Sequence, residues 1–417
     1  MLDMTSFNAA LKEYYTDETV EDMTYKDNPF YALVSKHESM LGEYEVVPVI
    51  YGNPQGRSAN FTRAQTRAAS TSSLLKKFLI TRVKDYSLAQ VDNETLLASE
   101  GDRGAFMRAA TLEFDGAINS LTRSIATAMY RGGYGSIGVV GASGVSSATI
   151  TLASLGDITN FEVGMELVVS TTEGSAVLRA LGSSGNGLII TGVNRSTGVL
   201  TFGYNVTDAT NGVPGTTDGD VLFVRGDRED SATPALTKIA GLAAWVPQSA
   251  PGSTSFFGVN RASDVTRLGG LRFDGRGMPI EEALIDGASL VAREGFKLDT
   301  YFINYANYSN LEKSLGSKVQ YVDLAANARI AFRGIRVNGP RGEINIVPDQ
   351  NCQGDTAWGV KMDVWQLGSI GKAVRVIDTD GLDMLRLNSS DGVESRWGFY
   401  GNLLCHAPGA NVNVQLA

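Results

Sequence analysis

The chain has 417 residues, of which 43% are apolar and 19% charged, and its formal net charge is −9. This balance is typical of a folded soluble protein, and the length predicts two or three domains. The acidic charge argues against a general nucleic-acid binder, and no apolar run reaches the roughly 20 residues needed to span a bilayer. Two cysteines exclude a disulfide framework, and the first residues do not have the pattern of a secretory signal.

Residues 1–42 are polar, acidic and weakly patterned. One interpretation is a frayed tail; the other is an extended arm that becomes ordered only against another chain. In the second interpretation, residues 28–31 and Leu33 would supply the anchoring side chains.

The next segment predicts two strands joined by a long loop. Residues 45–51 and 78–83 read as strands, and Pro48 suits an edge position. The roughly 25 residues between them have no core of their own, and loops of this length are usually functional. From Val46 to Lys84 there is no acid but there are seven basic residues. They either form a solvated face or contact an acidic surface of another copy. The contact hypothesis names Arg57, Arg63, Arg67, Lys76 and Lys77.

A long amphipathic helix is predicted over residues 102–131. Apolar residues recur there at steps of three or four, Asp102 can cap the first turn, and two glycines at 132–133 end the helix. Thirty residues would give a rod of about 45 Å. The side chains expected to face the subunit's own sheet include Phe114, Ile118, Leu121 and Ile125.

After this helix the composition changes. Residues 138–230 contain no Lys, Cys, His or Trp, and glycine recurs every few positions. Short alternating runs at 148–152, 165–170, 188–193, 198–204 and 220–225 predict a small all-β barrel or sandwich. Residues 133–138 match G-x-G-x-x-G, but they follow a helix and precede a β domain, so we interpret them as a flexible exit from the helix rather than a dinucleotide site.

The remainder is predicted to mix α and β structure. A helix is expected at 279–297 and a shorter one at 305–315, and residues 411–416 alternate as a strand would. Further strands are expected at 301–303, 334–347 (a hairpin), 359–364, 373–377 and 396–404.

The sequence offers little for catalysis. The two histidines, His37 and His406, lie far apart in the sequence, so metal sites and Ser/His/Asp triads have few ligands. Cys405 follows an apolar strand and is expected in the core. We therefore expect no catalytic, cofactor-binding or metal-binding residue and a structural protein rather than an enzyme.

The order of these parts resembles the major capsid proteins of tailed bacteriophages, which have the Hong Kong 97-type fold. The likeness covers nearly the whole chain and rests on the number and order of short segments rather than on one motif. These segments are 28–30, 256–261, 267–270, 279–286, 310–317, 332–336 and 400–403.

The resemblance implies an α+β fold with a defined division of the chain. The N-terminal arm would be 1–42, the E-loop hairpin 43–90, and the peripheral domain with its spine helix 91–137. An inserted β-barrel-like domain would be 138–232, and the axial domain with the rest of the peripheral domain 233–417.

The resemblance also implies a function and partners. Hexamers and pentamers of the chain would form an icosahedral shell around double-stranded DNA, assembled in the host bacterial cytoplasm. A separate scaffolding protein, a portal and a decoration protein are the implied partners, with non-specific DNA contact and no membrane. The alternative is a phage tail or surface adhesin with a glycan-binding β domain, although aromatic residues are sparse there.

Overall fold

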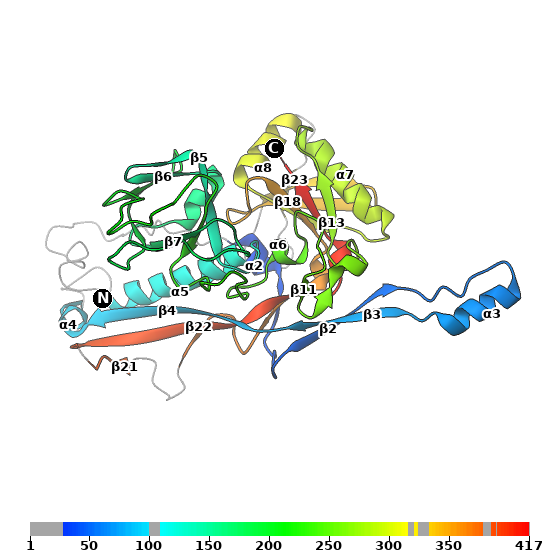
Figure 1. Cartoon of the computed structure of the whole chain (residues 1–417), viewed down its shortest axis with the longest axis horizontal. Helices are drawn as coiled ribbons and strands as arrows, with labels where there is room; N and C mark the ends of the chain where they lie inside the picture. The colour runs from blue at the N-terminus through cyan, green and yellow to red at the C-terminus, as the bar shows by residue number, and fades with distance from the viewer. Residues whose placement is uncertain are drawn as a thin grey trace.

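A computed structural model describes residues 28–99, 109–315, 321–323, 333–377, 385–388 and 390–416. Its long axis follows two antiparallel strands, β4 (Val83–Asp92) and β22 (Gly392–Cys405). Figure 1 shows helix α5 (Ala109–Ala128) and a β-barrel on one side of these strands, an α/β unit beside the barrel, and a hairpin that projects away from all of them.

The sheet around β22 is the platform of the molecule. The 14-residue strand β22 pairs with β4 from Gly392 to Gly401 and with β19 from Gly401 to Cys405. The platform is completed by β1 (Ser35–His37), β19 (Trp365–Ser369), β20 (Arg375–Val376) and β21 (Leu385–Arg386), and α4 (Asn93–Ser99) follows β4.

Helix α5 packs on this platform with the predicted apolar face. The ring of Phe114 lies 5.2 Å from that of Trp397 on β22, and Ile125 is completely buried. The described helix has 20 residues, about 30 Å, and residues 102–108, including the predicted cap Asp102, lie outside the described residues. The predicted end at 131 is wrong. The last turn tightens, because Tyr130 N–H and Arg131 N–H donate to carbonyls only three residues back.

The segment after α5 forms the predicted all-β structure, a closed barrel. Thr237 N–H and Lys238 N–H both donate to the Gly133 carbonyl, so the chain leaves the body and returns at one point. The first strand, β5, was not predicted and begins inside the G-x-G-x-x-G match, which is therefore not a flexible exit. In spatial order the strands are β10 (Val221–Val224), β5 (Ser136–Ser146), β6 (Thr149–Leu152), β9 (Val199–Phe202), β8 (Leu188–Asn194) and β7 (Glu166–Ser170).

The α/β unit is a seven-stranded sheet covered by two helices, α7 (Ile280–Arg293) and α8 (Tyr305–Leu315). Helix α8 has its predicted bounds, whereas α7 ends four residues before the predicted 297. The C-terminal strand pairs with β13 and β18, as its alternation predicts. The sheet order is β13 (Leu271–Asp274), β23 (Val412–Gln415), β18 (Thr356–Val360), β14 (Thr300–Ile303), β17 (Gly342–Pro348), β16 (Arg333–Gly339) and β15 (Tyr321–Asp323).

Short elements connect these parts. The predicted strand 359–364 is wrong in its second half, because β18 ends at Val360 and 362–364 form a 3₁₀ turn. The remaining short elements are α6 (Leu242–Trp245), β11 (Ser255–Phe256), β12 (Val259–Asn260) and the 3₁₀ turns Leu155–Asn160, Arg261–Ser263 and Pro408–Ala410.

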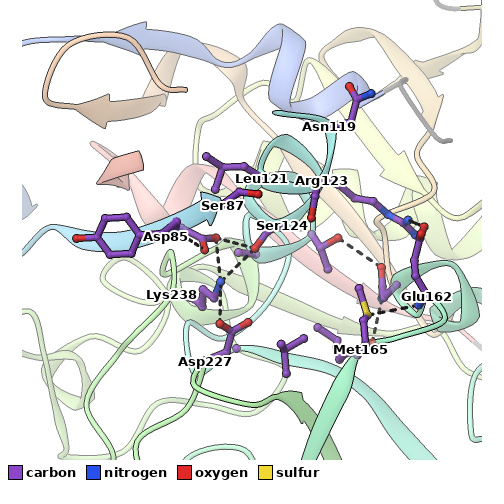
Figure 2. Close-up of a pocket in the computed structure, with 18 of the residues that line it drawn as sticks. Asp85, Ser87, Asn119, Leu121, Arg123, Ser124, Glu162, Met165, Asp227 and Lys238 are labelled. Atoms are coloured by element: carbon purple, nitrogen blue, oxygen red, sulfur yellow. Dashed lines mark hydrogen bonds and ion pairs between the residues drawn. The ribbon is translucent and has the colours of Figure 1, made fainter. Parts of the chain in front are cut away.

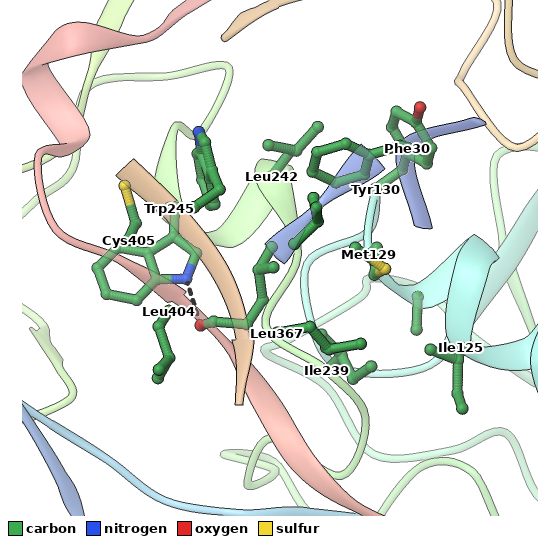
Figure 3. Close-up of a cluster of buried hydrophobic side chains, with 14 of the residues drawn as sticks. Phe30, Ile125, Met129, Tyr130, Ile239, Leu242, Trp245, Leu367, Leu404 and Cys405 are labelled. Atoms are coloured by element: carbon green, nitrogen blue, oxygen red, sulfur yellow. Dashed lines mark hydrogen bonds between the residues drawn. The ribbon is translucent and has the colours of Figure 1, made fainter. Parts of the chain in front are cut away.

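The start of the described chain belongs to this core. Helix α2 (Pro29–Leu33) buries Phe30, whose ring packs 5.0 Å from that of Phe302. The Asp349 carboxylate accepts from Phe30 N–H (3.2 Å) and from the Tyr130 hydroxyl (2.8 Å). The expectation that residues 28–31 anchor an arm on another chain is therefore wrong for Asn28, Pro29 and Phe30, which are buried in their own subunit. Figure 3 shows Phe30 and Tyr130 in the same cluster as Trp245 and Ile125.

Candidate assembly surfaces

The projecting hairpin consists of β2 (Glu45–Gly52) and β3 (Leu74–Ile80), paired in antiparallel register from Glu45 opposite Ile80 to Gly52 opposite Leu74. Among the strands that the structure describes, each of these two pairs only with the other, so Pro48 sits on an edge strand as predicted. The second predicted strand, 78–83, is interrupted after Ile80. Residues from Val83 onward belong to β4 in the platform, so the hairpin is shorter than the predicted 43–90.

The base of the hairpin is fixed in the core. Phe78 is fully buried, and its ring lies 5.1 Å from that of Trp245. Leu79 N–H donates to the Phe257 carbonyl at 2.9 Å. Because the base is packed and hydrogen-bonded, the ribbon leaves the body in a set direction rather than as a free loop (Figure 1).

The tip of the hairpin carries a helix where the sequence pattern predicts only a long loop. Helix α3 (Phe61–Ser70) begins at Asn60, whose side chain accepts from Arg63 N–H at 3.1 Å. An asparagine cap followed by Ala, Gln and Arg is a helix signal that would have found it. No residue of α3 is buried, so its stability depends on the cap, on helix propensity and on contacts outside the helix.

The five basic residues named from the sequence all lie on this hairpin. Arg57 precedes α3, two arginines lie one turn apart on α3, and two lysines lie on β3; all are exposed except the half-buried Lys76. None of the five makes an ion pair with another residue in the described ranges. The residues are Arg57, Arg63, Arg67, Lys76 and Lys77.

Apolar side chains are exposed beside these cations. Phe61 is 81% exposed, Ile50 66% and Leu75 57%, and the last two are directly opposite each other in the ribbon. Exposed apolar groups are common at interaction sites, so their position beside unpaired charge is compatible with the contact hypothesis, which stays a prediction. The spine-helix residues lie elsewhere and do not meet this surface: Leu121 and Ile125 are buried and Phe114 and Ile118 partly buried against the core.

A second feature lies between α5, β4 and the barrel, where a groove of about 930 Å³ opens. Figure 2 shows Lys238 in its wall between Asp85 of β4 and Asp227 of the barrel. The Lys238 ammonium lies 2.8 Å from Asp85 and 3.1 Å from Asp227, and the Ser124 hydroxyl of α5 donates to Asp85 at 2.6 Å. This ionic junction ties the barrel to the platform and to the spine helix.

Burial and charge act in opposite directions in this junction. Burial by itself lowers the pKa of Lys238, but the carboxylates of Asp85 and Asp227 outweigh it and hold that pKa above its usual value. Burial raises the pKa of Asp227, and Lys238 opposes this rise. No sequence pattern indicates the junction, because its members come from distant parts of the chain and carry no motif.

Replacing Lys238 by Met is expected to lower the free energy of unfolding by about 3–5 kcal/mol at pH 7, because Asp85 and Asp227 lose their counter-ion. The pKa of Asp227 then rises further above its unfolded value. The folded variant then binds a proton at Asp227 more tightly than the unfolded chain does. The stabilisation from this protonation is fully present at low pH and is lost as the pH rises through the raised pKa of Asp227. Urea denaturation should therefore show a smaller deficit at pH 4 than at pH 7.

The double variant Lys238→Met/Asp227→Asn is the control for this experiment. It removes one of the two facing carboxylates and should recover part of the stability at pH 7. If Lys238→Met lowers the free energy of unfolding by the same amount at pH 4 and pH 7, the ionic explanation is contradicted. The loss would then come from the packing of the Lys238 side chain alone.

No protein-family profile and no curated protein matches the sequence. Solved structures do match. The capsid asymmetric unit of cyanophage A-1(L) aligns over 97% of this chain and 96% of its own, with a TM-score of 0.51 and 12% identity. The chain has the fold of a phage capsid protein. Two further structures also align. That of Mycobacterium phage Ogopogo has 8% identity and a TM-score of 0.45, and the alignment covers all of both chains. That of the SrpI encapsulin from Synechococcus elongatus has 8% identity and a TM-score of 0.46, and the alignment covers 100% of this chain and 95% of the encapsulin chain.

The capsid-type fold confirms the predicted α+β class at the level of the whole chain. Among the residues placed in this fold, no helix is long and apolar enough to span a membrane, and no group of three His, Cys, Asp or Glu could hold a metal ion. Cys405 is fully buried, as expected, and burial raises the pKa of its thiol. His406 is exposed and lies 3.3 Å from Gln366.

Proposed function

We propose that the chain is the major capsid protein of a tailed bacteriophage, and that its hexamers and pentamers form an icosahedral shell around double-stranded DNA. The observation that carries the proposal is the hairpin: its base is fixed in the core while its tip presents unpaired cations and exposed apolar side chains. Such a surface is incomplete in the isolated subunit, and the capsid-type fold supplies the setting in which another copy completes it.

The physics of a shell favours this arrangement. A closed particle needs a large contact area divided among several neighbours, so that each contact is modest and reversible. A projecting arm with few contacts in its own subunit adds binding energy only when a neighbour is present. Once one arm is bound in a ring of subunits, the remaining contacts become intramolecular and form at a higher effective concentration.

The proposal includes the partners and location that the sequence resemblance implies. Scaffolding is supplied by a separate protein, the portal occupies one vertex, and a decoration protein binds the outside. DNA contact is non-specific, which suits an acidic chain, because a strongly basic lining would hold the genome tightly. Assembly takes place in the host bacterial cytoplasm and the product is the virion shell.

The barrel offers little support for the alternative of a glycan-binding adhesin. Sugar recognition commonly uses exposed aromatic rings. Among the exposed large apolar side chains described in the barrel, none is aromatic; they are Leu155, Val163, Val177 and Ile189.

Limited trypsin digestion tests the role of the hairpin. In the free subunit we expect the first cuts at Arg57, Arg63 and Arg67, because these side chains are exposed and unpaired. In assembled material the same bonds should be protected, whereas Arg195 in an exposed turn of the barrel should be cut in both samples. Mass spectrometry of the fragments over time gives the rates, and equal hairpin cleavage in free and assembled chains would contradict the proposal.

A further inference from the structure

One buried carboxylate holds the start of the described chain against the core. The Asp349 side chain is completely buried and accepts four hydrogen bonds from described residues. Two come from other segments: the Phe30 N–H of α2 donates at 3.2 Å, and the Tyr130 hydroxyl just after α5 donates at 2.8 Å. The other two come from Asn351, whose backbone N–H lies at 2.9 Å and whose side-chain amide lies at 3.0 Å. Asp349 therefore joins α2, the end of the spine helix and the loop after β17 in one buried cluster.

This carboxylate has no counter-ion in the described part of the chain. All four donors are neutral groups, and the nearby Arg131 is instead paired with Asp157 of the barrel at 2.5 Å. Burial raises the pKa of Asp349, and the four hydrogen bonds oppose this rise without cancelling it. The ionised form is therefore costly at this position, because a buried charge without a counter-ion loses its hydration.

The other titratable groups around the cluster do not take the same role. Burial raises the pKa of Tyr130 well above its ordinary value, and it does the same for the thiol of Cys352, so both stay neutral near pH 7. Asp355 is exposed, and Asp157 has its own counter-ion. Among these acids, only Asp349 is buried without a compensating charge. The full set of neighbours is Tyr130, Arg131, Asp157, Tyr305, Cys352 and Asp355.

Helix α2 has few attachments besides this cluster. The Phe30 ring packs 5.3 Å from that of Tyr130 and 5.0 Å from that of Phe302. Just downstream, β1 is held separately, because it pairs with β19 from Ser35 to His37. The five residues of α2 can therefore leave the core by rotation of the backbone between α2 and β1, while β1 stays in the platform.

We propose that Asp349 is a proton-sensitive latch for α2, which holds the helix on the core when the carboxyl group is protonated and releases it in a larger fraction of molecules when the group is ionised. The inference goes beyond the proposed function, because it concerns the isolated subunit. Its sign follows from linkage. The closed state binds the proton more tightly than the open state, in which Asp349 meets water. The contribution of this proton to docking is fully present below the ordinary pKa of an aspartate and is lost as the pH rises through the raised pKa of Asp349.

The two native cysteines make the latch measurable. Cys352 is buried three residues after Asp349, and its N–H donates to the Asp349 carbonyl at 3.3 Å. Its thiol lies 3.7 Å from the carbonyl oxygen of Phe302, the residue against which Phe30 packs. Cys405 is buried far from this cluster, on β22 of the platform. Opening of the latch should expose Cys352 to a thiol reagent, whereas Cys405 should react only when the platform opens.

Labelling of the folded full chain with N-ethylmaleimide between pH 5 and pH 8 tests the latch. Mass spectrometry gives the rate for each cysteine, and division by its rate in the urea-unfolded chain at the same pH removes the intrinsic effect of pH on the thiol. The protection of Cys352 should fall as the pH rises, by about tenfold for each unit by which the pKa of Asp349 is raised. The protection of Cys405 should not follow it. Identical profiles for the two cysteines would mean that Cys352 reacts only when the whole subunit opens, and would overturn the proposal.

Three substitutions assign the response to the cluster. Asp349→Asn removes the titrating group and should flatten the profile of Cys352. Tyr130→Phe removes a hydrogen bond that favours the ionised carboxylate, so the fall in protection should move to higher pH. Phe30→Ala should expose Cys352 already at pH 5 and leave Cys405 protected.

These variants also define the results that contradict the latch. A Cys352 profile that keeps its pH dependence in Asp349→Asn would assign the response to another group, and one that Phe30→Ala leaves unchanged would show that α2 does not cover the site. Circular dichroism confirms that each variant is folded. If Asp349→Asn does not fold, the shift in Tyr130→Phe decides, and no shift overturns the proposal. All measurements use the free subunit, so their outcome does not depend on whether particles form.

Discussion

Replacing Ile125 by Asp is expected to abolish folding of the subunit. Ile125 is completely buried where α5 crosses the core, so the new carboxylate would have neither water nor a counter-ion. Burial of an unpaired charge costs several kcal/mol, which is comparable with the whole stability of a domain, about 5–15 kcal/mol. Expression should yield aggregated or degraded chains, and the soluble fraction should lack a cooperative thermal transition.

Two substitutions on the same helix serve as controls. Ile125→Val removes one methylene group and should lower the free energy of unfolding by only about 1 kcal/mol. Ser120→Asp introduces the same charge at an exposed position and should fold normally. A folded Ile125→Asp subunit would contradict the interpretation of α5 as the spine of the subunit.

Reversing the charge of the three hairpin arginines should have the opposite outcome, because we expect the subunit to fold but not to assemble. The variant Arg57→Glu/Arg63→Glu/Arg67→Glu turns a segment with seven bases and no acid into one with four bases and three acids. None of the three side chains is buried, so the free energy of unfolding should change by less than about 0.5 kcal/mol per substitution. Assembly should fail because like charges then meet at every copy of the contact.

Size-exclusion chromatography and electron microscopy measure that outcome, and circular dichroism measures the fold. The matched control replaces the same three residues by Lys, which retains the charge and should retain at least part of the assembly. Normal particles from the Glu variant would mean that the basic hairpin is only a solvated face.

These two predictions differ because the sequence encodes folding and assembly in different places. The apolar period of three and four in α5 and the turn clusters of the barrel are local signals, and the structure contains both elements. Helix α3 was overlooked because its apolar face is small: Phe61, Ala64 and Ala68 recur at helical spacing, but two of the three are alanines and the rest of the segment is polar. Strand β5 was overlooked because its Gly, Ser and Ala residues resemble a linker.

Other features could not be predicted from local pattern at all. The Asn-Pro-Phe segment could bury itself on its own subunit or on another, and its sequence does not distinguish the two. The structure places Phe30 in its own subunit, against the rings of Tyr130 and Phe302, with its N–H donating to Asp349. The groove and the Lys238 junction depend on residues brought together from β4, α5 and the barrel. The basic character of the hairpin, in contrast, was evident from the sequence, and its role in contacts between copies remains a prediction.

Electron microscopy of the purified chain, with scaffolding protein added if the chain alone stays dispersed, tests the capsid proposal most directly. We expect closed particles of uniform diameter, or rings of five and six subunits. Dispersed single subunits under every assembly condition, with the hairpin resistant to trypsin in that state, would contradict it.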